Sequence, residues 1–121
     1  MASTKAVTVL DNNVTLTAGA GDHTSSVWDL TDGYGGILNI KITNGGTGPT
    51  LPAQAQVWVS PDDSNYYKLG GALIATLGNG IITSWSLIVP IGIEYLKVIS
   101  GSNTGQDVVI RVSGTEVTEI S

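Results

Sequence analysis

The stretch LNIKIT, residues 38–43, alternates apolar and polar side chains at every position. Successive side chains of a β-strand point to opposite faces, so this alternation places Leu38, Ile40 and Ile42 on one buried face. The stretch VVIRVS, residues 108–113, alternates in the same way after its first residue. No segment of the chain has the three- and four-residue apolar spacing of a helix. The sequence therefore predicts an all-β protein of half-exposed antiparallel strands.

Clusters of glycine, asparagine and aspartate divide the chain into short segments of this kind. These residues favour turns. Roughly eight or nine strands at this spacing predict a β-sandwich of jelly-roll or immunoglobulin-like type, with a closed barrel as the alternative. We expect one domain over residues 1–121, in which residues 1–13 can serve as an N-terminal arm. The expected strands are residues 5–10, which residues 14–17 continue after a turn, and 24–30, 37–43, 53–60, 66–75, 81–89, 93–100 and 107–113, to which residues 115–120 can add a terminal strand.

The apolar phase of these strands predicts the core. We expect two glycines in the segment 66–75 to mark a bulge. We expect the inner faces of the two sheets to carry Leu38, Ile40, Ile42, Val57, Val59, Leu87, Val98, Ile110 and Val112.

The charge of the chain is low and acidic. Charged residues make up 12% of the sequence and the net charge is −5, and this fraction is about half the usual share. The five Lys and Arg residues are scattered singly, whereas phosphate binding needs them clustered, so we expect no nucleic-acid partner. A surface rich in Thr and Ser suits a domain that neighbours will cover, although an ordinary neutral β surface has the same composition.

Cysteine and long apolar runs are both absent from the sequence. Neither disulfides nor thiolate metal sites can therefore hold the fold. The start of the chain has no apolar run long enough for a signal peptide, and the later runs are strand-sized. We expect synthesis in the cytoplasm of the host cell and no membrane partner.

Candidate catalytic and metal-binding residues are few. The single histidine, His23, lies beside Asp22 and Ser25, but a triad needs partners from separate elements, so we expect a solvent-exposed turn histidine. Asp62, Asp63 and Asn65 could offer oxygens to calcium, but aspartate in a hairpin turn usually bonds its own backbone. The glycine clusters lack the lysine of a phosphate-binding loop. We expect no enzyme, no metal and no cofactor.

The aromatic residues leave two possibilities open. Tryptophan and tyrosine can line a sugar-binding face or anchor a protein interface. Trp85 shares the apolar face of its strand, whereas Trp58 stands opposite Val57 and Val59, and either of these faces could point inward. We expect two of the three tryptophans, Trp28, Trp58 and Trp85, to lie in the core.

Three stretches resemble small β-sandwich structural proteins of tailed-bacteriophage virions. They are QVWVSPDDSNYY at residues 56–67, PIGIEYLKV at residues 90–98 and SNTGQDVVIRV at residues 102–112. The resemblance covers roughly the C-terminal half of the chain. It implies a capsid decoration (cement) protein of the virion, a homotrimer that binds the major capsid protein and bridges capsomers. The alternative is a carbohydrate- or receptor-binding module of a tail fibre or baseplate.

Two segments are candidates for the contacts of such a protein. The N-terminal segment has the β-branched residues of a strand that could add to the sheet edge of a neighbour. The loop at residues 45–52 is long and uncharged, and its two prolines limit its freedom, which lowers the entropy lost on docking. The predicted interface residues are Val7, Val9, Thr47, Pro49, Leu51 and Pro52.

Overall fold

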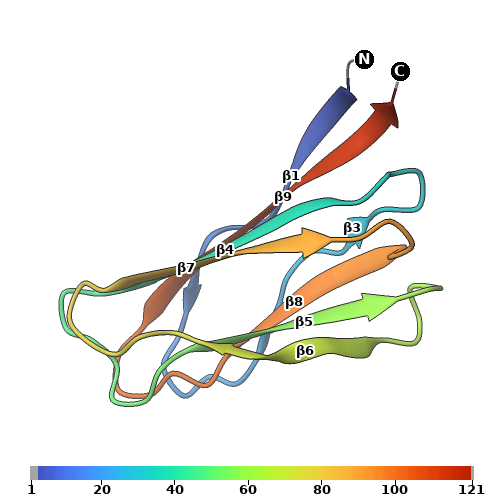
Figure 1. Cartoon of the computed structure of the whole chain (residues 1–121). Coiled ribbons are helices and arrows are strands. Elements are labelled where there is room, and N and C mark those ends of the chain that lie inside the picture. Colours follow the sequence, from blue (N-terminus) through green and yellow to red (C-terminus); the bar gives the residue numbers. More distant parts are fainter. Residues whose placement is uncertain (1–2, 121) are drawn as a thin grey trace.

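The computed structural model describes residues 3–120, which form two antiparallel sheets packed face to face (Figure 1). The described residues contain no helix, and hence none long and apolar enough to cross a membrane. The strands are β1 (Ser3–Leu16), β2 (His23–Thr24), β3 (Trp28–Asp29), β4 (Gly36–Asn44), β5 (Gln54–Ser60), β6 (Tyr67–Ile74), β7 (Ile82–Val89), β8 (Tyr95–Gly101) and β9 (Val108–Ile120).

The two sheets share the strands almost equally. The first sheet has the order β1-β9-β4-β7, and the second has the order β2-β8-β5-β6, with β3 also paired to β8. We call them sheet 1 and sheet 2. Because the sheets remain separate layers, the β-sandwich prediction is confirmed and the closed barrel is wrong.

The core lies between the sheets, on the faces that the alternation predicted. The inner residues of β4 are almost completely buried, while Asn39 and Lys41 between them are exposed. Val59 and Leu87 are partly buried and pack against the core. The remaining predicted core residues are all buried, namely Leu38, Ile40, Ile42, Val57, Val98, Ile110 and Val112.

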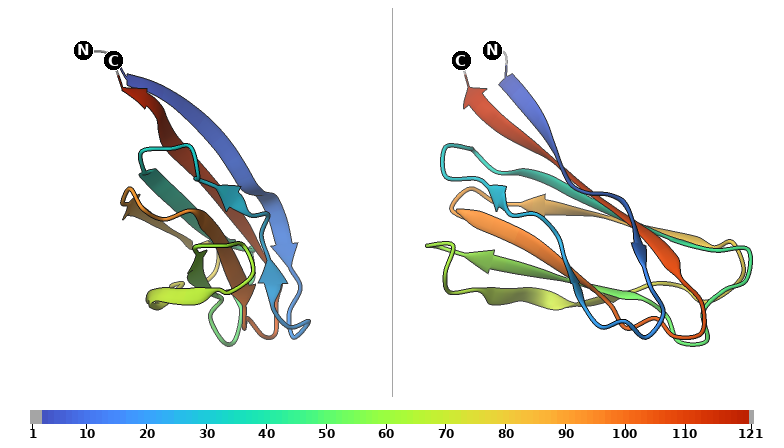
Figure 2. Two further views of the ribbon diagram at one scale, coloured as in Figure 1. Left: turned by 90° about the vertical axis from the view of Figure 1, so that its right-hand side faces the viewer. Right: turned by 180° about the vertical axis from the view of Figure 1, so that it is seen from behind.

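The first and last strands are longer than the sequence predicts. The expected turn at residues 11–13 is a bulged part of β1, where the pairing with β9 shifts and Asn13 has a φ of 52°. The expected break at Gly114 is absent, because this glycine continues β9 beneath the ring of Trp28. The paired ends of β1 and β9 project beyond the rest of the sandwich as a two-stranded ribbon (Figure 2).

Other boundaries agree better with the sequence. The expected bulge in β6 is confirmed, because the register with β5 shifts opposite Gly70 and Gly71.

The expected strand over residues 24–30 is wrong in extent. Residues 25–27 cross between two short strands, where the Ser25 hydroxyl accepts a hydrogen bond from the Val98 N–H at 2.9 Å. A side chain here replaces part of the backbone ladder.

The two sides of the sandwich differ. On the side of β1, the Ser26 N–H donates to the Leu10 carbonyl at 3.3 Å, and His23 Nε2 lies 2.8 Å from Asp11 Oδ1. These contacts join sheet 1 to the β2–β3 segment of sheet 2. On the opposite side, β6 and β7 are the edge strands. We call these the closed side and the open side.

An acidic cluster lies at the base of the projecting ribbon. Burial raises the pKa of the Glu116 carboxyl, and the nearby Asp29 and Asp32 raise it further. A raised pKa in the folded state means that ionisation of Glu116 costs stability, and this cost appears as the pH rises through that pKa.

Replacing Glu116 by glutamine should therefore raise the melting temperature at pH 7. The gain should shrink as the pH falls through the raised pKa, and it should vanish below the unfolded-state pKa of about 4.3, where the carboxyl is protonated in both states of the wild type. Thermal unfolding followed by circular dichroism across this pH range measures both effects. Glu119→Gln, at an exposed site on the same strand, is the matched control, and an equal gain in that variant would contradict the assignment.

Candidate interaction surfaces

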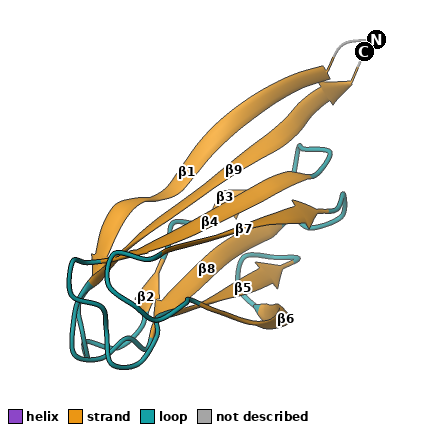
Figure 3. Cartoon of the chain, turned by 60° about the vertical axis from the view of Figure 1, so that its left-hand side comes forward, coloured by secondary structure: helices purple, strands orange, loops and turns teal. Residues whose placement is uncertain are grey.

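Two uncharged loops lie against each other at the end of the sandwich away from the chain termini. They are residues 45–52 and 75–81, and Figure 3 shows the loops gathered at that end. The Asn44 side-chain amide donates to the carbonyls of Thr76 and Gly78 at 2.9 and 2.8 Å, and the Gly48 N–H donates to Asn79 Oδ1 at 2.8 Å. We call this region the loop end. These contacts fix its backbone before any partner binds.

The loop end exposes aliphatic side chains. Leu51 comes from the first loop, and Leu77 and Ile81 come from the second. Asn44 is buried and its side-chain nitrogen bonds two carbonyls of the second loop, so it supports the backbone beneath these side chains. A rigid, uncharged surface with exposed leucines is suited to contact with another protein.

The predicted interface residues are only partly brought together. Thr47 and Leu51 are exposed and Pro52 is half-buried at the loop end, but Pro49 is buried and cannot contact a partner. The prediction for Pro49 is therefore wrong, because the second loop and the Thr50–Thr104 hydrogen bond hold this turn inward.

The other two predicted residues lie elsewhere. Val7 and Val9 are exposed on β1, and Val9 pairs with Ser113. The loop end begins after Asn44, which pairs with Val108. The two sites are thus separated by roughly 16 Å of strand. Residues 3–9 pair with β9 in their own chain, so this part of the N-terminal segment is an edge strand of sheet 1.

A groove runs along the open side between β6 and β7. It has a volume of about 360 Å³. Val57 of β5 lies at its floor, Leu69 and Leu73 come from β6, and Leu87 and Ile88 come from β7. This groove was not predicted from the sequence, although the apolar residues on both faces of β6 and β7 were a signal for it.

The outer face of sheet 2 carries the one outward-facing tryptophan. Trp58 pairs with Lys68 on one side and Lys97 on the other. It lines a hollow of about 200 Å³ together with Gln54 and Gln56. The Lys68 ammonium lies 5.6 Å from the centroid of the indole ring, so a cation already occupies one face of it.

The other two tryptophans are internal. Trp28 is buried, and Trp85 is partly buried and packs against the core. The expectation that two of the three tryptophans lie in the core is therefore met by Trp28 and only in part by Trp85. It leaves Trp58 as the tryptophan available to a ligand.

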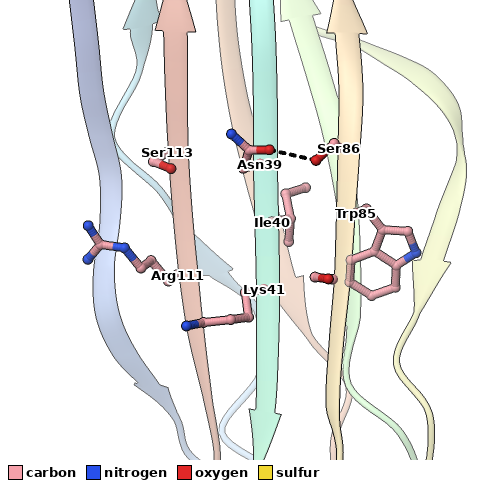
Figure 4. Close-up of a pocket in the computed structure, with 8 residues that line it drawn as sticks. Asn39, Ile40, Lys41, Trp85, Ser86, Arg111 and Ser113 are labelled. Carbon is pink, nitrogen blue, oxygen red and sulfur yellow. Dashed lines mark hydrogen bonds between the residues drawn. The ribbon is translucent and has the colours of Figure 1, made fainter.

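The outer face of sheet 1 is a polar surface with two neighbouring cations. Lys41 pairs with Arg111 across the β4–β9 ladder, and Figure 4 shows both among serine and asparagine side chains. Like charges directly opposite each other on a sheet are unfavourable. Arg111 donates to Asn12 Oδ1 at 2.6 Å, so an amide of β1 holds the guanidinium. The middle of this face is polar and shallow, whereas Ile37, Ile82 and Ile88 are exposed nearer the ends of its strands.

His23 is not a free turn residue. Its imidazole is 34% exposed and contacts the carboxylate of Asp11, which is 3% exposed. The expectation of a solvent-exposed histidine is therefore wrong, because the bulge in β1 directs Asp11 inward to meet it. The Ser25 hydroxyl donates to the Ser26 carbonyl. The Ser25 hydroxyl is thus bonded to the backbone, and His23, Asp11 and Ser25 do not form a hydrogen-bonded triad.

The acidic turn after β5 is a self-contained hydrogen-bonding unit. Asp62 Oδ1 accepts bonds from the N–H groups of Ser64 and Asn65 at 2.9 and 2.8 Å, and Oδ2 accepts one from the Asn65 amide. These bonds hold the pKa of the Asp62 carboxyl well below its usual range. Within residues 3–120 no group of three acidic or histidine side chains is placed to hold a metal ion.

Asp62→Asn should lower the melting temperature at neutral pH. The carboxylate stabilises the fold above its unfolded pKa of about 3.9, and this contribution fades as the pH falls further toward the folded value. The difference between variant and wild type should therefore narrow only in strong acid. Melting curves between neutral and strongly acidic pH test this, with the exposed loop variant Asp22→Asn for comparison. A difference that is independent of pH would exclude the carboxylate as the cause.

The comparisons with known proteins reveal a likeness of fold. No protein-family model matches the chain, and no curated protein matches it in sequence. The VP2 subviral particle of infectious bursal disease virus matches 95% of this chain and 33% of its own at a TM-score of 0.62 and 10% identity. The Gx strain of that virus matches at a TM-score of 0.59 and 9% identity, over 96% of this chain and 32% of its own. Our chain thus spans about a third of the viral chains.

A bacterial fibre protein shares the architecture over nearly its whole length. The Bacillus endospore appendages, described as disulfide-linked pili, match 97% of this chain and 92% of their own at a TM-score of 0.54 and 12% identity. Our chain has no cysteine, so its residues cannot form a disulfide link of that kind. At these identities the matches establish a β-sandwich and leave the function to the surfaces described above.

Proposed function

We propose that the protein is a capsid decoration (cement) protein of a bacteriophage virion. It binds the major capsid protein through the loop end and stabilises the head by bridging capsomers. Its action is structural rather than enzymatic, and it needs no cofactor. It is made in the cytoplasm of the host and resides in the virion.

The observation that carries this proposal is the rigid loop end. Its exposed Leu51 and Leu77 sit on a backbone that hydrogen bonds already hold in place, so little entropy is lost on docking. The absence of charge in both loops lowers the cost of removing water from the contact. The fold shared with VP2 and the resemblance of residues 56–67 to phage virion proteins are consistent with this role.

Binding to particles that lack the protein tests the proposal. Leu51→Asp places a charge in the contact and should weaken binding at least about tenfold. Ile91→Asp is the matched control, because Ile91 is an exposed aliphatic residue in the turn at the other end of β7. Cosedimentation with capsids gives both affinities. Equal binding by Leu51→Asp and the wild type would remove the loop end from the contact.

A contribution of β1 to capsid binding can be tested with a deletion that removes only the first part of the strand. Leu10 and Asp11 are buried, so a truncation that reaches them would damage the core. Removing residues 2–7 takes away Val7, which is 71% exposed, and spares both buried residues. Capsid binding by this truncated protein separates a role of β1 from that of the loop end.

A second candidate function is carbohydrate binding at the hollow around Trp58. An aromatic ring beside amide side chains is the arrangement that sugar recognition uses. Lys68 competes for the ring, which makes this function the weaker of the two. Glycan-array binding that disappears in Trp58→Ala, with capsid binding unaffected by Leu51→Asp, would favour it over the decoration role.

A further inference from the structure

The edge strands of the sandwich differ in how they are protected from pairing with another chain. Exposed strand edges are usually guarded by charges, bulges, glycines or short length. In β1 the register shifts at three places and Lys5 adds a charge. In β6 a bulge, Lys68 and two glycines interrupt the edge. The edge strands β2 and β3 have two residues each.

The edge strand β7 has none of these features. Its sequence, ITSWSLIV, contains no charge, glycine or proline, and its pairing with β4 is continuous over eight residues. Ile88 is 80% exposed and Ile82 is 61% exposed, although both lie in a regular strand. An unguarded, apolar edge of this length is a surface for strand addition.

The backbone groups that β7 offers can be identified. The Asn44 N–H donates to the Ile81 carbonyl, in register with the β4–β7 ladder. Residues of an antiparallel strand bond alternately to one side and the other. The odd-numbered residues of β7 therefore bond to β4, and the N–H and C=O groups of Ile82, Ser84, Ser86 and Ile88 face the open edge.

We propose that β7 pairs antiparallel with β7 of a second copy, across a two-fold axis at Trp85. The four residues whose backbone groups face the open edge are, in order, Ile, Ser, Ser and Ile, a sequence that is the same in both directions. An antiparallel pair centred on Trp85 therefore places Ile82 opposite Ile88 of the second copy, and Ser84 opposite Ser86. Each such pair exchanges two backbone hydrogen bonds.

Side chains near the axis fit this arrangement. Ser86 Oγ donates to Asn39 Oδ1 at 2.6 Å, so its rotamer is already fixed, and the two isoleucine pairs cover the most exposed apolar residues of the strand. Figure 4 shows the indole of Trp85 on the side of β7 away from β4, where the second copy would lie. The two open-side grooves then face each other beneath the joined sheet.

The arrangement also fixes the stoichiometry. A strand edge that pairs with its own copy is an isologous contact, which closes at two chains. The structure thus favours a dimer over the trimer that the phage resemblance implies. This inference is independent of the capsid role, because it concerns β7 rather than the loop end, and it is tested on the isolated protein.

Sedimentation equilibrium of the full chain gives the first test. The wild type should be a dimer, and Ile88→Lys should weaken dimerisation at least about tenfold, because two lysines would meet the apolar edge. Val7→Lys makes the same change on the other edge strand of sheet 1 and should leave the dimer intact. A wild type that is monomeric at its highest soluble concentration would overturn the proposal. So would a monomer whose capsid binding is lost in Ile88→Lys, since the edge would then receive a strand of another protein.

Disulfide trapping gives the register. The chain has no native cysteine, so Ser84→Cys and Ser86→Cys can be made singly and one of them tagged. Residues opposite each other in an antiparallel pair are close enough for a disulfide. The two variants are mixed and oxidised, and the products are separated on a non-reducing gel. The disulfide-linked dimer of one Ser84→Cys chain with one Ser86→Cys chain should exceed the dimers of two identical variants. A predominance of like pairs, or no dimer, would contradict the two-fold register.

Discussion

Replacing Trp28 by alanine should lower the free energy of unfolding by about 3–5 kcal/mol, as expected for a fully buried tryptophan. Its side chain is 1% exposed and is the largest of the fully buried side chains. The ring lies directly on Gly114, where an added Cβ would come within 2.3 Å of it. Because the backbone of β9 forms this contact with the ring, the surroundings cannot collapse into the cavity that the alanine variant would leave. Equilibrium unfolding in urea measures the loss.

Trp28→Phe provides the control for this substitution. The Trp28 Nε1–H is buried without a hydrogen-bond partner in the described part of the chain, and phenylalanine removes that unpaired donor while keeping an aromatic ring. We expect Trp28→Phe to lose less than half as much stability as Trp28→Ala. Equal losses would mean that the donor has a partner, such as a buried water molecule.

Ile40→Ala should cost about 2–5 kcal/mol, because it removes a buried side chain from the middle of β4. Ile40 is flanked on the inner face by Leu38 and Ile42, and all three are buried. Neighbouring strands bond to β4 on both edges, which restricts its movement toward a cavity. Chemical denaturation of the purified variant gives the value.

Ile37→Ala makes the same truncation on the same strand but on the outer face, where the side chain is partly exposed. It should cost much less than Ile40→Ala, since less apolar surface leaves the protein interior. If the two variants lost the same stability, the strand phase that assigns Ile40 to the core would be wrong.

The sandwich and its core could be predicted from sequence because both depend on a local pattern. The two-residue alternation in residues 38–43 specifies which face is buried, and burial of Leu38, Ile40 and Ile42 follows directly. The bulge at Gly70 and Gly71 could be predicted for the same reason, since glycine in a strand marks irregular pairing.

The ends of strands and the contacts between distant segments were harder to predict from the sequence. The residues around Asn13 have the composition of a turn, yet pairing with β9 keeps them in a strand, and the turn propensity is used in a bulge. The contact of His23 with Asp11 depends on how sheet 1 meets β2. No local pattern contains that information.

The candidate surfaces were predictable in part. The lack of charge in residues 45–52 correctly indicated a loop with an exposed Leu51, but the inward turn of Pro49 depends on the second loop that packs against it. The position of β7 at the edge of sheet 1 could not be predicted from the sequence, because the order of strands is a property of the whole sheet. In sequence, β7 and β4 look equally suited to a central position.

The pairing of β1 with β9 has a consequence for how the protein is made. In sheet 1, β9 lies between β1 and β4, so β1 has no strand to pair with until residues 108–120 have left the ribosome. The β5–β6 hairpin and the more distant β4–β7 pair can both form earlier. Closure of so long a loop is slow, and the nascent chain keeps its first strand unpaired throughout. Folding should therefore be completed only after synthesis of the domain, and chaperone demand should depend on how quickly β9 inserts.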